Sequence, residues 1–138
     1  MPKTYDLKSV EKKWQDKWEN DKTFRFDNTS DRPIFSIDNP PRYASGGLHI
    51  GHATHYTHID MIGRYRRLMG YNVFLPLCFD VNGMPIEVNV EKKYKVSPQN
   101  IPRSEFNALC SEFANKNIAT MITQFKELGC SFDPSIYY

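Results

Sequence analysis

The chain has 138 residues and a formal net charge of +2 at pH 7, with 40% hydrophobic and 25% charged residues. This length suffices for one domain with its own core, and the small charge excludes a strong whole-chain attraction to nucleic acid. The start of the chain lacks the apolar core of a signal peptide, and no apolar run approaches the roughly 20 residues that span a bilayer. The three cysteines form no C-x-x-C pattern, which is typical of a protein in a reducing cytoplasm. Together these features predict a soluble, cytoplasmic protein with no membrane partner.

The first predicted element is an amphipathic helix over residues 6–21. Val10, Trp14 and Trp18 recur four residues apart, and charged residues fill the other faces of the helix. Two tryptophans on one stripe predict that this helix docks onto a larger body.

A strand, a helix and a second strand are predicted next, over residues 33–38, about 48–69 and 71–77. The first strand is expected to be buried and to end at Pro40, and Gly70 is expected to end the helix. This order predicts a βαβ unit with parallel strands, and therefore an α/β fold.

The remainder is predicted as loops and one long helix. Residues 79–87 and 97–103 carry turn signals. Ser104 is expected to cap a helix that Gly129 ends. The apolar positions of this helix include Phe106, Leu109, Phe113, Ile118, Met121, Ile122, Phe125 and Leu128.

All four histidines lie three residues apart, at His49, His52, His55 and His58. On a helix, positions three apart turn by roughly 60°, so His49 and His58 lie on opposite sides and about 13 Å apart. Zinc needs its ligands within about 2.1 Å, so we expect no metal site. We expect His55 to pack on the apolar stripe of the helix and His58 to face solvent.

The residues around the first two histidines predict a phosphate-binding loop. In an open α/β sheet, ligands bind at the carboxyl ends of strands, where helix N-termini point. Gly46 and Gly47 let a ligand approach the backbone, and the helix start offers unpaired N–H groups. His49 and His52 add donors, and Gly51 between them leaves a flat place for a planar base. The pattern is neither G-x-G-x-x-G nor G-x-x-x-x-G-K-[ST].

With "HIGH" at residues 49–52, the chain resembles the class I aminoacyl-tRNA synthetases. "PPRYASGGLHIGHA" is similar to the opening of the valyl, isoleucyl and leucyl enzymes, and "RYRRLMGYNVFLPL" to their next strand. "FDVNGMPIEVNVEK" stands where they carry a Gly-x-Asp-x-x-Gly stretch, and "ELGCSFDPSIYY" resembles the segment before their editing insertion. The resemblance covers essentially the whole chain.

The resemblance implies an N-terminal helical extension over residues 1–30. Residues 31–138 would form the first half of a Rossmann-like nucleotide-binding domain, with parallel strands and flanking helices, cut before the editing insertion. Because no K-M-S-K-S-like loop is present, we expect an N-terminal fragment that is inactive alone.

Cys78 and Phe79 ahead of Asp80 resemble the archaeal-type valyl enzymes, so valine is the expected amino acid. Isoleucyl and leucyl enzymes are the alternatives within the family. A non-enzymatic nucleotide-binding or interaction module and a nucleotidyltransferase of related fold are alternatives outside it.

The activity that the resemblance implies is activation of an amino acid with ATP to an aminoacyl-adenylate, followed by transfer to tRNA. ATP, carrying Mg²⁺, and tRNA, bound mainly through other domains, are the implied partners. The catalytic residues would be His49 and His52, as donors to phosphoryl oxygens. Ser45, Gly46 and Gly51 would join them in binding ATP, while Pro41, Tyr43 and Asp80 would bind the amino acid, with the Pro41 carbonyl and the Asp80 carboxylate holding its ammonium group. For Asp80 an Asx-turn in "DVNG" is the alternative.

Overall fold

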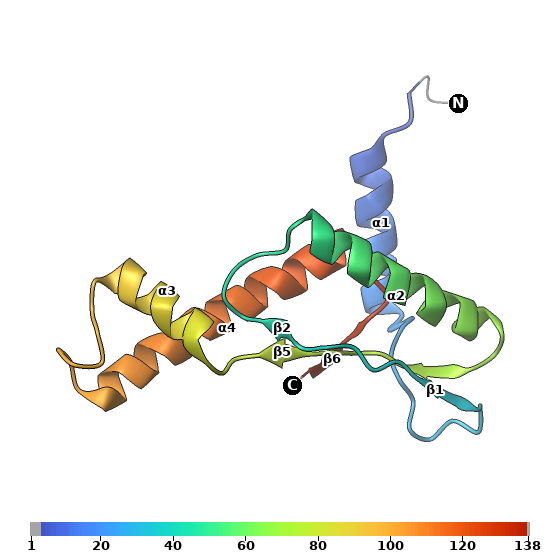
Figure 1. Cartoon of the computed structure of the whole chain (residues 1–138). Coiled ribbons are helices and arrows are strands. Elements are labelled where there is room, and N and C mark those ends of the chain that lie inside the picture. Colours follow the sequence, from blue (N-terminus) through green and yellow to red (C-terminus); the bar gives the residue numbers. More distant parts are fainter. Residues whose placement is uncertain (1–3, 138) are drawn as a thin grey trace.

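The structure is a computed structural model that describes residues 4–137. Helices and short strands alternate along the described part of the chain (Figure 1). In chain order the elements are α1 (Leu7–Asn20), β1 (Ile34–Ser36), β2 (Arg42–Tyr43), α2 (Ile50–Leu68), β3 (Asn72–Phe74), β4 (Pro76–Leu77), β5 (Phe79–Asp80), α3 (Met84–Tyr94), α4 (Arg103–Glu127) and β6 (Asp133–Tyr137).

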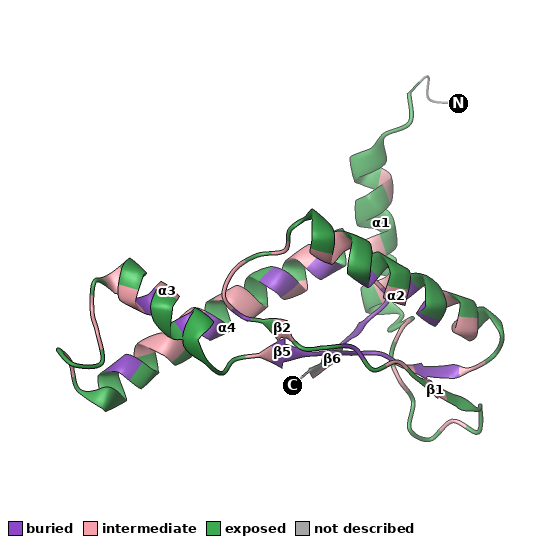
Figure 2. Cartoon of the chain, viewed as in Figure 1, coloured by how far each residue is buried: buried purple, intermediate pink, exposed green. Residues whose placement is uncertain are grey.

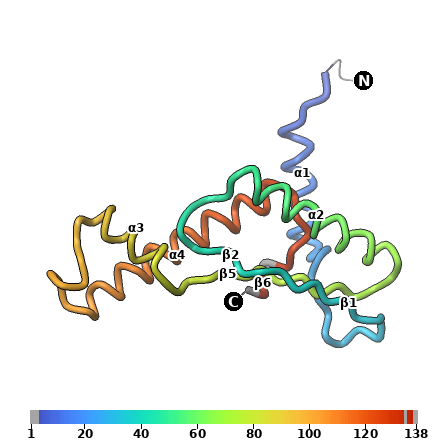
Figure 3. The backbone as a smooth tube through the Cα atoms, viewed as in Figure 1, coloured from blue at the N-terminus to red at the C-terminus, as the bar shows by residue number. Residues whose placement is uncertain are grey.

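The strands pair in parallel, β1 with β3, β2 with β5 and β4 with β6. Hydrogen bonds of 3.0 Å from the Ile37 N–H to the Phe74 carbonyl and from the Arg42 N–H to the Cys78 carbonyl join the first two pairs. Residues 34–44 therefore run alongside residues 72–80 (Figure 3). The Leu75 carbonyl accepts a hydrogen bond from the Asp133 N–H, so β6 lies on the opposite edge of residues 72–80. These residues form the central segment of the fold.

This central segment is buried on both faces (Figure 2). Side chains alternate between the two faces of a strand, yet Asn72, Val73, Leu75, Leu77 and Cys78 are all less than 5% exposed. Burial on both faces is typical of parallel strands that have helices packed on them. The βαβ unit predicted from the sequence is confirmed by β1, α2 and β3.

Aromatic rings join α2, α4 and the segment before β6. Tyr56 of α2 meets Phe125 of α4 at a ring-centroid distance of 4.7 Å, and Phe132 lies 5.3 Å from Phe125. Gly63 brings α2 close to the central segment, because a Cβ there would lie 3.3 Å from the Leu75 side chain. These contacts fix α2 against the strands.

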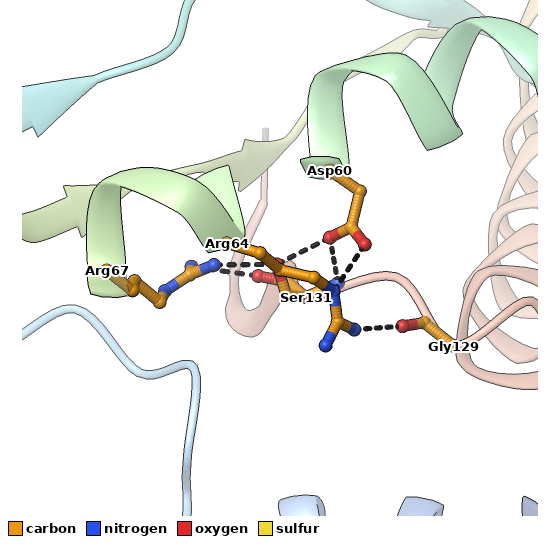
Figure 4. Close-up of polar contacts among 5 residues, drawn as sticks. All are labelled: Asp60, Arg64, Arg67, Gly129 and Ser131. Carbon is orange, nitrogen blue, oxygen red and sulfur yellow. Dashed lines mark hydrogen bonds and ion pairs between the residues drawn. The ribbon is translucent and has the colours of Figure 1, made fainter. Parts of the chain in front are cut away.

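A polar network also ties α2 to the segment after α4 (Figure 4). Asp60 is 7% exposed and accepts hydrogen bonds from the Ser131 backbone and hydroxyl and from Arg64 Nε, the last at 2.7 Å. Arg64 donates to the Gly129 carbonyl at 2.6 Å, and Arg67 donates to the Ser131 hydroxyl and carbonyl.

The tryptophan stripe of α1 docks only in part. Trp18 lies 5.4 Å from the Phe24 ring and faces the Arg64 guanidinium, whereas Trp14 remains 41% exposed. Helix α1 projects away from the strands in Figure 1. None of the described helices is both long and apolar enough to cross a membrane.

The structure corrects two predictions about strands. The strand at residues 33–38 lies at an edge, and Ile34 is 63% exposed, because β1 pairs only with β3 among the described elements. The strand predicted over residues 71–77 is interrupted at Leu75, between β3 and β4.

Two predictions about the second half are also wrong. Residues 79–87, predicted as a loop, contain β5 and the start of α3, because β2 supplies a partner strand for Phe79 and Asp80. Ser104 does not cap α4. The helix starts at Arg103 with Pro102 in the N-cap position, where the missing N–H of proline costs nothing.

Candidate functional site

His49 and His52 together close the N-terminus of α2. His49 is the N-cap residue, and its Nδ1 accepts the Gly51 N–H at 3.1 Å. The Nδ1 of His52 accepts the His49 N–H at 3.2 Å, and the two rings stack with centroids 3.6 Å apart. A neutral imidazole that accepts through Nδ1 carries its hydrogen on Nε2. Both rings are therefore set to donate through Nε2.

His52 favours the neutral form. Partial burial lowers its pKa below the ordinary value of 6.5, because removal from water disfavours the charged ring. The positive charge of Arg42 adds to this shift, followed by the imidazoles of His49 and His55. At neutral pH the ring is a single donor and not a cation.

Gly51 leaves room for the ring of His49. A Cβ at this position would lie 3.0 Å from the His49 Cε1 and 3.2 Å from its Nδ1. A residue without a side chain at position 51 therefore leaves space for the capping position of His49. The flat surface for a planar base remains a prediction.

The loop before α2 is held by a carboxamide of α4. Gln124 accepts the Leu48 N–H at 2.8 Å, only two residues from the start of α2. A Cβ on Gly47 would lie 3.2 Å from the Gln124 amide, so a glycine here allows the amide to reach the backbone. By contrast, nothing lies within 4 Å of a Cβ on Gly46.

Two further amides hold the other end of the loop. Asn117 of α4 donates to the Ala44 carbonyl at 3.0 Å, and Asn89 of α3 donates to the Ser45 carbonyl at 3.4 Å. None of these amide side chains was predicted from the sequence. Asn117 and Gln124 are seven residues apart and share one helix face, so polar positions within an apolar stripe were the available signal.

The structure places Tyr43 beside Asp80. They are register partners of β2 and β5, and the Ala44 N–H donates to the Asp80 carbonyl at 3.0 Å. Pro41 directly precedes β2. The Asp80 carboxylate accepts the Asn82 N–H at 2.9 Å, so the Asx-turn is present. That bond uses one carboxylate oxygen, Oδ1.

Two buried donors close to Pro41 have no hydrogen-bond partner within residues 4–137. They are the Asn39 amide nitrogen and the Nε of Arg42. Asn39 is 5% exposed and lies between β1 and β2, so it belongs to neither strand. Buried donors are normally paired, so unpaired ones are expected where a ligand supplies the acceptor. Neither residue was singled out from the sequence.

The other two histidines take no part in this arrangement. His58 is exposed as predicted. His55 is also exposed, with an edge contact to Tyr56 at 5.2 Å, so the prediction that it packs is wrong. The buried face of α2 is formed by Tyr56, Asp60 and Gly63 instead. Within the described residues, no group of three or more His, Cys, Asp or Glu side chains lies close enough to hold a metal ion.

The chain matches the family of tRNA synthetases class I (I, L, M and V) over residues 13–137. The chain belongs to this family. The family match includes both the His49–His52 helix start and the pair of strands at Tyr43 and Asp80.

Its relatives include valine--tRNA ligases of archaea. The chain is 43% identical to that of Methanopyrus kandleri over 94% of its own length, and 45% identical to that of Archaeoglobus fulgidus over 99%. It spans only 14% and 16% of these relatives. A similar solved structure is the Agrobacterium radiobacter K84 agnB2 LeuRS in a ternary complex with tRNA and LeuAMS. It has a TM-score of 0.81 and 27% identity, and the alignment covers 98% of this chain and 16% of that one.

Proposed function

We propose that this chain is the first part of the catalytic domain of a cytoplasmic synthetase that activates valine with ATP and transfers it to tRNA. The observation that carries the proposal is the 43–45% identity to valine--tRNA ligases along nearly the whole chain. Residues 31–138 would form the first half of a Rossmann-like domain, and residues 1–30 its helical extension. Other parts of the synthetase would supply most of the tRNA contacts.

The nucleotide would bind at the start of α2. The Nε2–H groups of His49 and His52 face away from the helix backbone that their Nδ1 atoms cap, so both are free to donate to phosphate oxygens. Ser45 and Gly46 would line the phosphate side and Gly51 the adenine side. Mg²⁺ would arrive on the nucleotide, since protein sites usually hold it through substrate phosphates.

The reaction asks for positioning and charge stabilisation more than for acid–base chemistry. The amino-acid carboxylate is already a nucleophile, and its attack on the α-phosphate spreads negative charge over phosphoryl oxygens. Two neutral donors fixed by backbone bonds lose little freedom when that charge develops. A neutral His52 suits this role, because it donates without competing for a proton.

The amino acid would bind at the strand pair of Tyr43 and Asp80. The Oδ2 of Asp80 and the Pro41 carbonyl would hold its ammonium group, and Tyr43 would line the side-chain pocket. The Asx-turn supports this role, because it fixes the orientation of the Asp80 carboxylate through the Asn82 N–H. The unpaired donors of Asn39 and Arg42 would contact negatively charged oxygens of the substrates.

The proposal is tested by valine-dependent exchange of pyrophosphate into ATP, in the synthetase that carries this chain. His52→Ala should lower the exchange rate by about 100-fold, as loss of one fixed donor to a developing oxyanion does. His58→Ala, an exposed histidine of the same helix, should exchange normally. Asp80→Asn should raise the valine KM. An unchanged rate for His52→Ala would remove this residue from catalysis.

The same assay separates the alternatives. The solved neighbour is a LeuRS, so leucine and isoleucine are the competing substrates to compare with valine. The comparison is needed because one methylene changes binding in a pocket by only about 1–3 kcal/mol. Faster exchange with leucine or isoleucine than with valine would correct the proposed specificity. No exchange with any of the three would favour a non-enzymatic module.

A further inference from the structure

A cavity opens at the end of α2 opposite to His49 and His52. It has a volume of about 370 Å³ and lies between the segment after α1, the last turns of α2 and the start of β3. Arg67 and His52 are 15 residues apart on α2, so they lie roughly 22 Å apart along the helix axis. The cavity is therefore separate from the proposed ATP site. Its lining includes four arginines and no carboxylate: Arg25, Arg32, Arg64 and Arg67.

The two arginines of α2 are half-buried, and they differ in whether a carboxylate pairs with the guanidinium. Arg64 forms an ion pair with Asp60. Arg67 forms none in the part of the chain that the structure describes, where both of its terminal nitrogens donate to Ser131. Burial lowers the pKa of Arg67 to about 10, and the nearby charges of Asp60 and Asp133 oppose that shift. A buried cation without a directly paired anion is costly.

The other two arginines come from a segment held over this end of the helix. The amide of Asn72 receives the Asp27 N–H at 3.3 Å and donates to the Asp27 carbonyl at 2.6 Å, which fixes the segment against β3. Arg25 and Arg32 flank Asp27 and are exposed. Hydrogen bonds from the Thr29 hydroxyl and N–H are the main reason that the pKa of Asp27 is lowered, and the charges of Arg32 and Arg25 add to this shift. Neither arginine approaches a described carboxylate within 4.0 Å.

The helix dipole does not explain this arrangement. Basic residues in the last turn of a helix compensate its negative end, which accounts for cations on α2. Arg25 and Arg32 lie on a different segment, yet they line the same cavity. Convergence of guanidinium groups from two segments, without a carboxylate in the lining, is typical of a site for an oxyanion.

We propose that this cavity binds a phosphate group through Arg25, Arg32, Arg64 and Arg67. Each guanidinium has five N–H donors, so Arg64 and Arg67 retain donors beyond those used in Figure 4. The volume exceeds that of one phosphate, and the ring of Phe24 lies 5.0 Å from Arg64 and 5.2 Å from Arg67. A phosphate carried by a nucleic-acid backbone or by a free polyphosphate fits this chemistry. The site does not depend on the proposed function.

The test uses calorimetric titration of the 138-residue chain with two probes, inorganic pyrophosphate and a single-stranded RNA hexamer. Arg67→Gln would disturb the contacts to Ser131, so the variant of choice is the exposed pair Arg25→Gln and Arg32→Gln. This double variant should bind the probe about tenfold more weakly, through loss of charge-assisted hydrogen bonds. Arg103→Gln, which removes an exposed arginine at the start of α4, is the control for loss of positive charge outside the cavity.

Because pyrophosphate can also bind at the proposed ATP site, the titrations are repeated in the His52→Ala background, which removes a donor of that site. Binding that persists in this background and is weakened by Arg25→Gln and Arg32→Gln belongs to the cavity. If RNA is the ligand, the double variant should also reduce the salt slope of binding by about 1.4, the value for two phosphate contacts on a single strand. Saturable binding of pyrophosphate alone would identify a free polyphosphate. The proposal is overturned if neither probe binds saturably, if the double variant binds as well as the unaltered chain, or if Arg103→Gln weakens binding equally.

Discussion

Replacement of Asp60 should strongly lower the stability of this chain. Its carboxylate is 7% exposed and receives three hydrogen bonds, two from Ser131 and one from Arg64. In Asp60→Asn the side chain keeps its shape. However, one oxygen becomes an NH₂ group, which faces a donor and can accept nothing from it. At least one buried donor then loses its partner.

The magnitude follows from the exposure of each partner. The Arg64 side chain is 36% exposed, so solvent screens its ion pair, which contributes about 1 kcal/mol or less. Ser131 is fully buried, and a hydrogen bond to a charged acceptor contributes about 1.5–3 kcal/mol after exchange with water. We expect Asp60→Asn to lower the free energy of unfolding by about 3 kcal/mol. That is a large part of the 5–15 kcal/mol typical of a domain.

The assay is urea unfolding of the 138-residue chain, followed by circular dichroism and by tryptophan fluorescence. Asp16→Asn is the matched control, because Asp16 pairs with Lys12 on the exposed surface of α1. Such pairs are worth less than about 1 kcal/mol. A loss below 1 kcal/mol for Asp60→Asn, or equal losses in both variants, would refute the assigned role of Asp60 in joining α2 to Ser131.

Three predictions concern the start of α2. Gln124→Leu should make the Leu48 amide exchange its hydrogen about tenfold faster, since that amide loses its acceptor; unchanged protection would contradict the bracing role. Gly51→Ala should displace the His49 ring and shift its NMR signals, whereas Gly46→Ala, with open space around its Cβ, should leave them in place. The His52 signals should titrate below pH 6.5, so the folded state binds fewer protons than the unfolded chain just below that pH. The contribution of His52 to stability is then present above pH 6.5 and is lost as the pH falls toward its folded pKa. A titration midpoint of the His52 signals at or above pH 6.5 would contradict this pH dependence.

Elements that depend on local residue patterns could be predicted from the sequence. The period of Val10, Trp14 and Trp18 predicts α1, and the positive φ of Gly70 and Gly129 lies where helices were expected to end. The βαβ order follows from local signals as well. The placement of the small-residue loop directly before two histidines also located the helix start that became the candidate site.

Contacts between residues far apart in the sequence could not be predicted in this way. Ser131 reaches Asp60 across 71 residues and Gln124 reaches Leu48 across 76, distances over which no local periodicity carries information. β5 is too short to show alternation, and both β5 and β6 exist because a partner strand satisfies their backbone groups. For the same reason Arg42 could not be singled out from the sequence. Its significance lies in a charge brought next to His52 by the pairing of β2 with β5, and in a buried Nε that the fold leaves without an acceptor.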